Sequence, residues 1–540
     1  MDSLSGETWD AVICGTGLSQ SLLALALSRS KKRILHLDPN EFYGEHEAAL
    51  SLQEADAWVE AHASAGISQQ PSVALASTSI ESRGTSLSET RNSVIIDERL
   101  GVTTTSARGS RIFRNANVWK ITDAEARGLS FPRAYSLALA PQIIHTKSKL
   151  LSQLVSSRAY RQVEFLAVGS FFIYDTTDTT SGATLARIPS SREDVFSTQS
   201  IPARSKRSLM KFLKFVIDYD SDEQTPVWQG KADRLLAEFL CDEFKLDGAL
   251  RNYILALTLS LDGEVTVQDG LAAIHRHLTS TGLFGPGFCA VYPKWGGMSE
   301  IAQVGCRAGA VGGGIYMLNT QVSMKSNSDG NEISLNLSND VSVQSTVFIS
   351  SQHTSTTSSQ TIARLVVVIN SPLQSLFEIL AEGAPTPSVA VVAFLSGSLR
   401  NLTEPRSDVP VYAFVHSSDT GECPSGQSVI YLTTLATSQA VHILDAALVA
   451  LLQVAATSAE CLYKLYYEQT TSARQPLTTL RGNATVFEFP SPSLGLAFDD
   501  ASLEAVKEAW KLVMKGDASD DTYLIFEDRE GMGDDDDIYE

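Results

Sequence analysis

Two glycines and one acid near the start of the chain have the spacing of a dinucleotide-binding motif. Gly15 and Gly17 follow an apolar run at 11–14, and a second apolar run ends at Asp38. In a strand, glycine turn, helix and strand of this kind, the turn lets the backbone approach a pyrophosphate and the acid contacts the ribose. The spacing therefore predicts the architecture of a dinucleotide-binding unit.

Gln20 occupies the third small position of this motif and argues against a bound dinucleotide. In G-x-G-x-x-G the third small residue lets the helix pack closely on the strand beside the pyrophosphate. Here a long polar side chain stands in that place. Two interpretations remain, a cofactor site and a scaffold that kept the geometry and lost the ligand, and Gln20 favours the second. We expect no cofactor.

The histidines and cysteines give no clear sign of other chemistry. His275 and His277 form H-x-H, but at helical spacing they point to different faces, so surface histidines are favoured over a metal site. We find no G-x-S-x-G, P-loop or H-E-x-x-H pattern. The cysteines are scattered without a C-x-x-C pair and are expected to be reduced thiols: Cys14, Cys241, Cys289, Cys306, Cys423 and Cys461. No catalytic residue and no metal ligand is predicted.

Length and charge limit the class of protein. At 540 residues the chain is too long for one ordinary core, so two or more domains are expected. The net charge of −20 argues against nucleic acid as a partner, although it permits a basic protein partner. No apolar run approaches the roughly 20 residues that span a bilayer, and the first residues lack the form of a secretory signal. We therefore expect a cytoplasmic protein.

The order of apolar runs predicts an α/β scaffold with an inserted helical part. The predicted parts are 1–125, the first part of the α/β domain with a flexible Ser/Thr-rich insertion at 63–92; 126–280, mainly helical with a strand return at 163–188; 281–515, the second part of the α/β domain; and 516–540, an acidic tail.

The helical part is apolar on more than one face. Apolar residues from 267 to 278 follow helical spacing, and the runs at 206–219, 233–244 and 250–261 are similarly rich. One explanation is a bundle that packs its own core. The other is a set of helices that part to admit an apolar ligand. The sequence leaves both open.

Strands dominate the pattern after residue 315. The segments 316–324 and 332–337 flank turn residues and predict a hairpin, and 343–350 predicts a further strand. The runs at 438–465 and 501–515 predict two long helices. A strand is also expected at 94–97, written Val-Ile-Ile-Asp.

Three separated blocks resemble the Rab escort protein and Rab GDP-dissociation inhibitor superfamily. They are WDAVICGTGL…RILHLDPNEFYGE, SREDVFSTQS…KRSLMKFLKF and YPKWGGMSEIAQVGCRAGAVGGGIYMLN. The resemblance implies a GDI-type fold, similar to FAD/NAD(P)-binding proteins but without flavin. It would have mixed sheets and an inserted, smaller all-helical domain.

The resemblance also implies two protein-binding sites. Tyr43, Glu300 and Arg307 match residues with which the family binds Rab GTPases, although Trp295 replaces an expected tyrosine and the approach to Glu300 is one residue longer than usual. Exposed tyrosine and charged residues suit such an interface. Phe196 and Arg207 match the pair with which escort proteins grip the Rab geranylgeranyl transferase, and recycling inhibitors lack the phenylalanine.

The resemblance implies a non-catalytic escort as the function. It would bind newly made, GDP-bound Rab, present the Rab C-terminal cysteines to the α/β heterodimer of the transferase, and carry the prenylated Rab to membranes with transient membrane contact. The geranylgeranyl chains would need apolar shelter, for which Leu213, Leu236 and Ile274 are the candidates. A recycling Rab GDP-dissociation inhibitor is the alternative, and a flavin-dependent oxidoreductase is a remote one.

Overall fold

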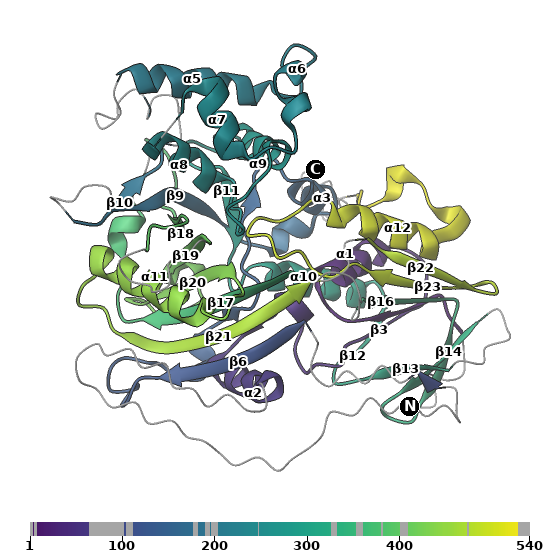
Figure 1. Ribbon diagram of the computed structural model, residues 1–540. Helices are drawn as coiled ribbons and strands as arrows, with labels where there is room; N and C mark the ends of the chain where they lie inside the picture. The colour runs from purple at the N-terminus through teal and green to yellow at the C-terminus, as the bar shows by residue number, and fades with distance from the viewer. Residues whose placement is uncertain are drawn as a thin grey trace, which may run out of the picture.

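The structure of the protein is a computed structural model (Figure 1). It describes residues 4, 8–63, 102–103, 112–176, 182–189, 195, 203–246, 248–325, 332–352, 360–379, 382–399, 409–471 and 475–527. The predicted strand at 94–97, nearly all of the insertion at 63–92 and the end of the acidic tail lie outside these residues. Within them, no helix is both long and apolar enough to cross a membrane.

The predicted strand, turn, helix and strand are present and form the centre of a six-stranded sheet. Neighbouring strands run parallel except at one edge, where β22 pairs antiparallel with β23. In order across the sheet, the strands are β12 (Ile315–Met317), β3 (Ile34–Leu37), β2 (Ala11–Cys14), β16 (Val347–Ser351), β23 (Ala484–Phe489) and β22 (Leu477–Arg481). The short apolar runs of β2 and β3 are buried because helices cover one face of this sheet and strands of a second sheet cover the other.

Helix α1 (Leu18–Leu27) packs against two other helices, α10 (Met298–Val311) and α12 (Ser502–Met514). Two glycines set the close approach of α1 and α10. A Cβ atom at Gly305 would lie 2.4 Å from the carbonyl oxygen of Ser21, and one at Gly312 would lie 2.0 Å from that of Ser28. Only glycine fits at such contacts, so the sequence of α10 fixes its position beside the dinucleotide-like turn.

A five-stranded sheet lies beside the first, in the order β1 (Thr8–Trp9), β15 (Ser342–Ser345), β14 (Ile333–Leu337), β13 (Val322–Lys325) and β5 (Val102–Thr103). The predicted hairpin is confirmed for β13 and β14, which pair antiparallel. Residues 315–317 instead join the first sheet as β12. The single strand predicted at 343–350 is two strands, β15 and β16, which belong to different sheets.

The largest sheet has ten strands. Its path is β6 (Phe113–Lys120), β21 (Cys461–Thr471), β17 (Gln360–Ile369), β20 (Ser428–Leu435), β19 (Val411–Ser417), β18 (Val389–Phe394), β9 (Phe165–Asp175), β11 (Ala290–Pro293) and β8 (Ile144–His145), with β10 (Thr184–Arg187) beside β9. Helix α11 (Ala440–Ala455) packs on β17 and β20, and α2 (Leu52–His62) packs on β6 (Figure 1). A two-stranded ladder joins β4 (Ala49–Leu50) to β7 (Leu137–Ala138).

The helix predicted at 438–465 was too long. It ends at Ala455, and the chain then enters β21, which pairs with both β6 and β17. Tyr463, Leu465 and Tyr467 are buried within this strand. Aromatic side chains suit a sheet, and pairing on both sides outweighs the helical spacing that continued from α11. By contrast, the helix predicted at 501–515 is confirmed as α12.

Five helices gather at the top of Figure 1: α5 (Ala203–Ile217), α6 (Thr225–Trp228), α7 (Leu236–Phe244), α8 (Gly248–Leu257) and α9 (Val267–Ser280). They have a core of their own, in which Phe212, Phe215, Phe239 and Phe244 form aromatic contacts. Part of the stretch predicted to be helical, 130–162, is different. It holds short strands and α3 (Lys149–Ser156), which pack with the sheets. The predicted domain limits themselves stay a prediction.

Candidate functional site

The place where a dinucleotide would put its pyrophosphate is filled by the protein's own carboxylates. Oε2 of Glu47 accepts a hydrogen bond from the backbone amide of Leu18, the first residue of α1, at 3.2 Å. Oε2 of Glu45 accepts from Nε2 of Gln20 at 3.4 Å. A Cβ atom at Gly15 would lie 2.6 Å from that same Glu45 oxygen. The turn is therefore packed against these acids rather than open to a ligand.

Asp38 is likewise engaged by its own neighbours. Its Oδ2 accepts from the amide of Thr16 at 2.7 Å and from the Thr16 hydroxyl at 2.6 Å, and its Oδ1 accepts from the amide of Asn40 at 2.7 Å. A helix N-terminus favours an anion, and here Glu47 already supplies one. A pyrophosphate would meet two acids at the turn, and a ribose would find Asp38 occupied. The residues present do not fit a dinucleotide.

Tyr43 lies where the segment after β3 crosses the start of α10. The amide of Gly44 donates to the hydroxyl of Thr16 at 3.0 Å, which ties this segment to the glycine turn. A Cβ atom at Gly44 would lie 3.3 Å from Oγ of Ser299, in the first turn of α10. Tyr43 is half-buried, and burial together with the nearby Cys306 raises the pKa of its phenol.

Helix α10 carries the other two residues predicted to bind Rab. Glu300 and Arg307 are seven residues apart, or about two turns, so they share one face of the helix. Arg307 is exposed and Glu300 is half-buried. Burial raises the pKa of Glu300, and the Arg307 guanidinium opposes this effect. The structure thus places Tyr43 beside the helix that carries Glu300 and Arg307, although Tyr43 is far from both in sequence. We call these three residues the α10 platform.

A buried polar cluster, which the sequence did not indicate, supports the loop that leads into α10. Glu422 accepts from the hydroxyls of Tyr292 at 2.8 Å and Tyr431 at 2.9 Å, and its other partner is Nδ1 of His416 at 2.7 Å. None of these side chains is more than 2% exposed. They come from β11, β19, β20 and a connecting turn, and only the folded sheet brings them together.

The loop above this cluster has a strained backbone. Trp295 is 53% exposed and has a φ of 72°, and its amide donates to the carbonyl of Thr420 at 2.8 Å. A Cβ atom at Gly297 would lie 2.6 Å from the hydroxyl of Tyr292. The contact of Gly297 with Tyr292 and the hydrogen bond from Trp295 to Thr420 therefore fix the loop that precedes Glu300.

Of the two residues predicted to bind the transferase, the described residues include one. Arg207 is exposed on α5, which lies at the outer edge of the helical group and away from α10 (Figure 1). Phe196 lies outside the described residues. Val195, its neighbour, is buried in the core of the helical group.

A cavity of about 590 Å³ lies among α5, α8 and α9. Its lining is mainly apolar, and includes Val195, Leu213, Ile217, Tyr253, Leu257 and Leu278. Of the three residues predicted to shelter lipid, only Leu213 lines it. Leu236 and Ile274 are fully buried in the core of the helical group instead. The packed core confirms the first explanation of the apolar helices. The second, that the helices part to admit an apolar ligand, stays a prediction.

His277 is not the surface residue that the H-x-H pattern predicted. It is 4% exposed and contacts the ring of Phe171, with centroids 4.8 Å apart. The prediction was wrong because α9 is covered on two sides, by the other helices and by the ten-stranded sheet. His275 faces the helices, and its Nδ1 donates a hydrogen bond to the carbonyl oxygen of Val216 at 3.0 Å. All six cysteines are free thiols, as expected.

Known proteins with similar sequences include ones named as geranylgeranyltransferase components and one named as a Rab escort protein. "Rab proteins geranylgeranyltransferase component A" of Saccharomyces cerevisiae is 29% identical over 433 residues, which cover 79% of this chain and 61% of that protein. "Rab escort protein 1" of Arabidopsis thaliana is 27% identical, over 59% of this chain and 55% of that protein. The chain thus spans about three fifths of the length of the Saccharomyces cerevisiae and Candida albicans relatives that it matches.

Solved structures with the same fold confirm the predicted fold class. A Rab GDI from Plasmodium falciparum superposes with a TM-score of 0.61 at 16% identity, over 96% of this chain and all of that one. An oxidoreductase from Methanosarcina mazei superposes with a TM-score of 0.50 at 11% identity, over 92% of this chain and 99% of that one. The family model for the GDP dissociation inhibitor matches residues 5–70 and 90–387. Since these residues are more than half of the chain, the protein belongs to the GDP dissociation inhibitor family.

Proposed function

We propose that this chain is a Rab escort protein, a component that binds newly made, GDP-bound Rab GTPases and presents them to a Rab geranylgeranyl transferase. The observation that carries the proposal is the similarity to relatives named as component A of that transferase in several organisms. A component distinct from the transferase itself needs no catalytic residues. The self-filled glycine turn supports a role without cofactor chemistry.

The proposed Rab contact is the α10 platform. An exposed Arg307 and a half-buried Glu300 offer charges of both signs to a polar switch surface, and Tyr43 adds amphipathic contact area. The exposed Trp295 lies on the loop just before α10 and enlarges this surface. Aromatic and arginine side chains are the types that contribute most to association free energy.

The proposed contact with the transferase α/β heterodimer is Phe196 together with Arg207. Arg207 is exposed on α5 and is accessible to a partner. Because α5 and α10 lie in different parts of the molecule, Rab and transferase could be bound at the same time (Figure 1). Simultaneous binding is what presentation of one protein to another requires.

The cavity among α5, α8 and α9 is the proposed shelter for geranylgeranyl chains on prenylated Rab. Its volume of about 590 Å³ lies within the range of small-molecule sites. Each CH₂ group moved from water to an apolar site contributes about 0.8 kcal/mol. An apolar cavity can therefore hold a lipid in solution and release it to a bilayer, with the protein acting in the cytoplasm and touching membranes transiently.

A prenylation assay tests this function. Purified transferase, GDP-loaded Rab and labelled geranylgeranyl diphosphate are incubated with and without this chain, and lipid transfer to Rab is measured. We expect transfer only when the chain is present. Phe196→Ala and Arg207→Ala should reduce transfer while leaving Rab binding intact, and Arg204→Ala, which also changes an exposed arginine of α5, is the matched control.

The second candidate is a recycling Rab GDP-dissociation inhibitor, which the structural similarity to Rab GDI favours. Such a protein would extract prenylated Rab from membranes but would not support prenylation. Lipid transfer that is equal with and without this chain, combined with Rab extraction from vesicles, would replace the escort function with this one. A flavin-dependent oxidoreductase would instead purify with bound flavin and absorb at its visible bands.

A further inference from the structure

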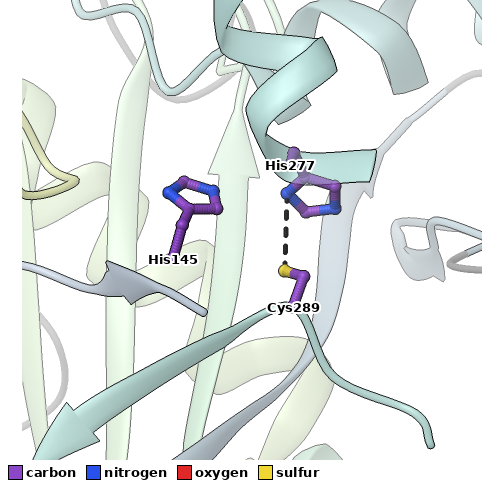
Figure 2. A group of neighbouring side chains, drawn as sticks. All are labelled: His145, His277 and Cys289. Atoms are coloured by element: carbon purple, nitrogen blue, oxygen red, sulfur yellow. Dashed lines mark hydrogen bonds between the residues drawn. The ribbon is translucent and has the colours of Figure 1, made fainter. Parts of the chain in front are cut away.

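His145, His277 and Cys289 bring three metal-binding atoms together beneath the end of α9 (Figure 2). His145 ends β8, His277 lies in the last turn of α9, and Cys289 directly precedes β11. The sulfur and one nitrogen of each ring all lie within 4.8 Å of one another. Each residue is at most 4% exposed. This cluster is separate from the α10 platform and from Arg207.

Backbone hydrogen bonds hold the three elements in fixed positions. The amide of Thr146 donates to the carbonyl of Cys289 at 3.0 Å, and Ala290 lies opposite His145 in the β8–β11 register. The Thr146 hydroxyl donates to the carbonyl of Ser280 at 2.6 Å, which joins the end of α9 to β8. The side chains therefore project from a rigid frame, as a metal site requires.

The spacing of the atoms suits a transition-metal ion. Metal–nitrogen bonds of about 2.0 Å and metal–sulfur bonds of about 2.3 Å, at a tetrahedral angle, put nitrogen and sulfur about 3.5 Å apart. Nδ1 of His277 and Sγ of Cys289 are 3.5 Å apart. Figure 2 shows the His145 ring facing this pair. A movement of roughly 1 Å by that ring would complete a three-ligand set.

A structural role without metal accounts for only two of the three residues. The Cys289 thiol can donate to Nδ1 of His277, which would leave that pair satisfied. Neither ring nitrogen of His145, however, has a hydrogen-bond partner among the described residues. Leaving two buried polar atoms unpaired costs free energy.

We propose that His145, His277 and Cys289 form a binding site for a thiophilic d¹⁰ metal ion, Zn²⁺ or Cu⁺, that fastens the end of α9 to the ten-stranded sheet. Imidazole and thiolate are the ligands that these ions prefer. On binding, the S–H bond of Cys289 breaks, a metal–sulfur bond forms and the proton leaves to solvent.

Zn²⁺ and Cu⁺ would differ in the number of ligands that they need at this site. A cavity of about 10 Å³, lined by His277, Cys289 and Thr281 among others, is just large enough for one water, which would be the fourth ligand of Zn²⁺. Cu⁺ needs no fourth ligand and forms a neutral complex with one thiolate, which burial near Arg276 favours. Thr281 and Leu257 line both this cavity and the larger one, so the ion would also stiffen a wall of the larger cavity.

Metal titration of the full chain tests the site. Reduced, metal-free protein is titrated without oxygen with Zn²⁺ and with Cu⁺ against chromophoric chelators, and with Co²⁺ as a spectroscopic substitute. We expect one equivalent of Zn²⁺ or Cu⁺, and a thiolate-to-Co²⁺ charge-transfer band. Cys289→Ser should abolish the band and weaken binding by more than about a hundredfold, since changes beyond the ligands already cost 10- to 100-fold. Cys306→Ser, at a buried cysteine in α10 that contacts Ser21, is the matched control and should change neither.

A measurement on the unmodified chain guards against variants that fail to fold. X-ray absorption at the edge of the bound metal should show one sulfur and two nitrogens, and the melting temperature should rise with metal concentration. The proposal is overturned if the unmodified protein binds none of these ions stoichiometrically, if the bound ion has no sulfur neighbour, or if Cys306→Ser rather than Cys289→Ser loses the band.

Discussion

The hydroxyl of Tyr292 donates a hydrogen bond to Oε1 of Glu422 at 2.8 Å, and neither side chain is exposed to solvent. Tyr292→Phe removes this donor and leaves a buried carboxylate oxygen without a partner. We expect a loss of about 1–3 kcal/mol in the free energy of unfolding, measured by urea denaturation. Tyr160→Phe, at a tyrosine that is 39% exposed, should change it by less than about 0.5 kcal/mol. Equal stability of Tyr292→Phe and the unmodified protein would show that Glu422 does not depend on this bond.

The contact between α1 and α10 predicts a strong effect of one added methyl group. Gly305→Ala places Cβ 2.4 Å from the backbone carbonyl oxygen of Ser21, which cannot move without shifting α1. Overpacking of this kind costs about 1–3 kcal/mol or more, so the melting temperature should fall clearly. Gly230→Ala is the control, because no atom lies within 4 Å of the position that its methyl group would take and its φ is not positive. A Gly305→Ala variant as stable as this control would contradict the close helix contact.

Acid should destabilise the protein through His36. Burial lowers the pKa of this ring in the folded state to about 4, and its Nε2 is hydrogen-bonded to the carbonyl of Gly15 at 2.6 Å. The unfolded chain, with a histidine pKa of about 6.5, binds the proton more readily. The contribution of His36 to the free energy of unfolding is therefore fully present above about pH 6.5 and is lost as the pH falls toward 4. Between about pH 7 and 5 the loss from this ring is about 2 kcal/mol.

The variant His36→Gln tests whether the pH dependence of the free energy of unfolding comes from His36. Its free energy of unfolding should depend less steeply on pH than that of the unmodified protein, whereas His442→Gln, at an exposed histidine of α11, should keep the original slope. Identical slopes for all three proteins would mean that His36 does not titrate in this range. Tyr316, whose ring centroid lies 4.7 Å from that of His36, does not ionise there, since burial raises its pKa.

On the proposed function, Arg307→Glu should weaken Rab binding by at least about tenfold, or about 1.4 kcal/mol. The change reverses a charge on the exposed face of α10 and places it near Glu300, so the platform becomes uniformly acidic. Lys31→Glu makes the same charge change at another exposed position and serves as the control. Affinity for fluorescently labelled, GDP-bound Rab gives the comparison. If both variants weaken binding alike, the effect comes from net charge and not from the α10 platform.

On the proposed function, filling the cavity of about 590 Å³ should weaken lipid binding and leave the binding of unprenylated Rab unchanged. Leu213→Trp adds bulk to a side chain that lines the cavity, so affinity for a fluorescent geranylgeranylated peptide should fall at least about tenfold. Binding of unprenylated Rab should be unchanged. Ala272→Trp adds the same indole at an exposed position of α9 that does not line the cavity. Retention of the peptide by Leu213→Trp would place the lipid elsewhere.

The sequence predicted local units well when their pattern was short and self-contained. The turn at Gly15 and Gly17, the hairpin of β13 and β14, and helix α12 all depend on neighbouring residues. The prediction failed at 456–465, where helical spacing continued but the chain leaves the helix and pairs with two strands. Such pairing is a property of the whole sheet and leaves no local signal.

The same reasoning explains which site residues were found. Glu300 and Arg307 were identified through the family resemblance, and the helix that they share then places them on a common face. Gln20 indicated that the motif had lost its ligand. Glu45 and Glu47 occupy the position of that ligand, but they lie beyond the second strand and could not be assigned without the fold. His145 and Cys289 are 144 residues apart in sequence, and only the pairing of β8 with β11 makes them neighbours.

The acids that close the glycine turn, Glu45 and Glu47, also affect whether the folded state depends on a ligand. Enzymes that hold flavin lose folded protein when riboflavin is scarce, because the empty form is less stable. Here Glu47 is part of the chain and is always present at Leu18. The folded state of this turn should therefore gain its stability from Glu47 itself and not from a ligand whose concentration varies.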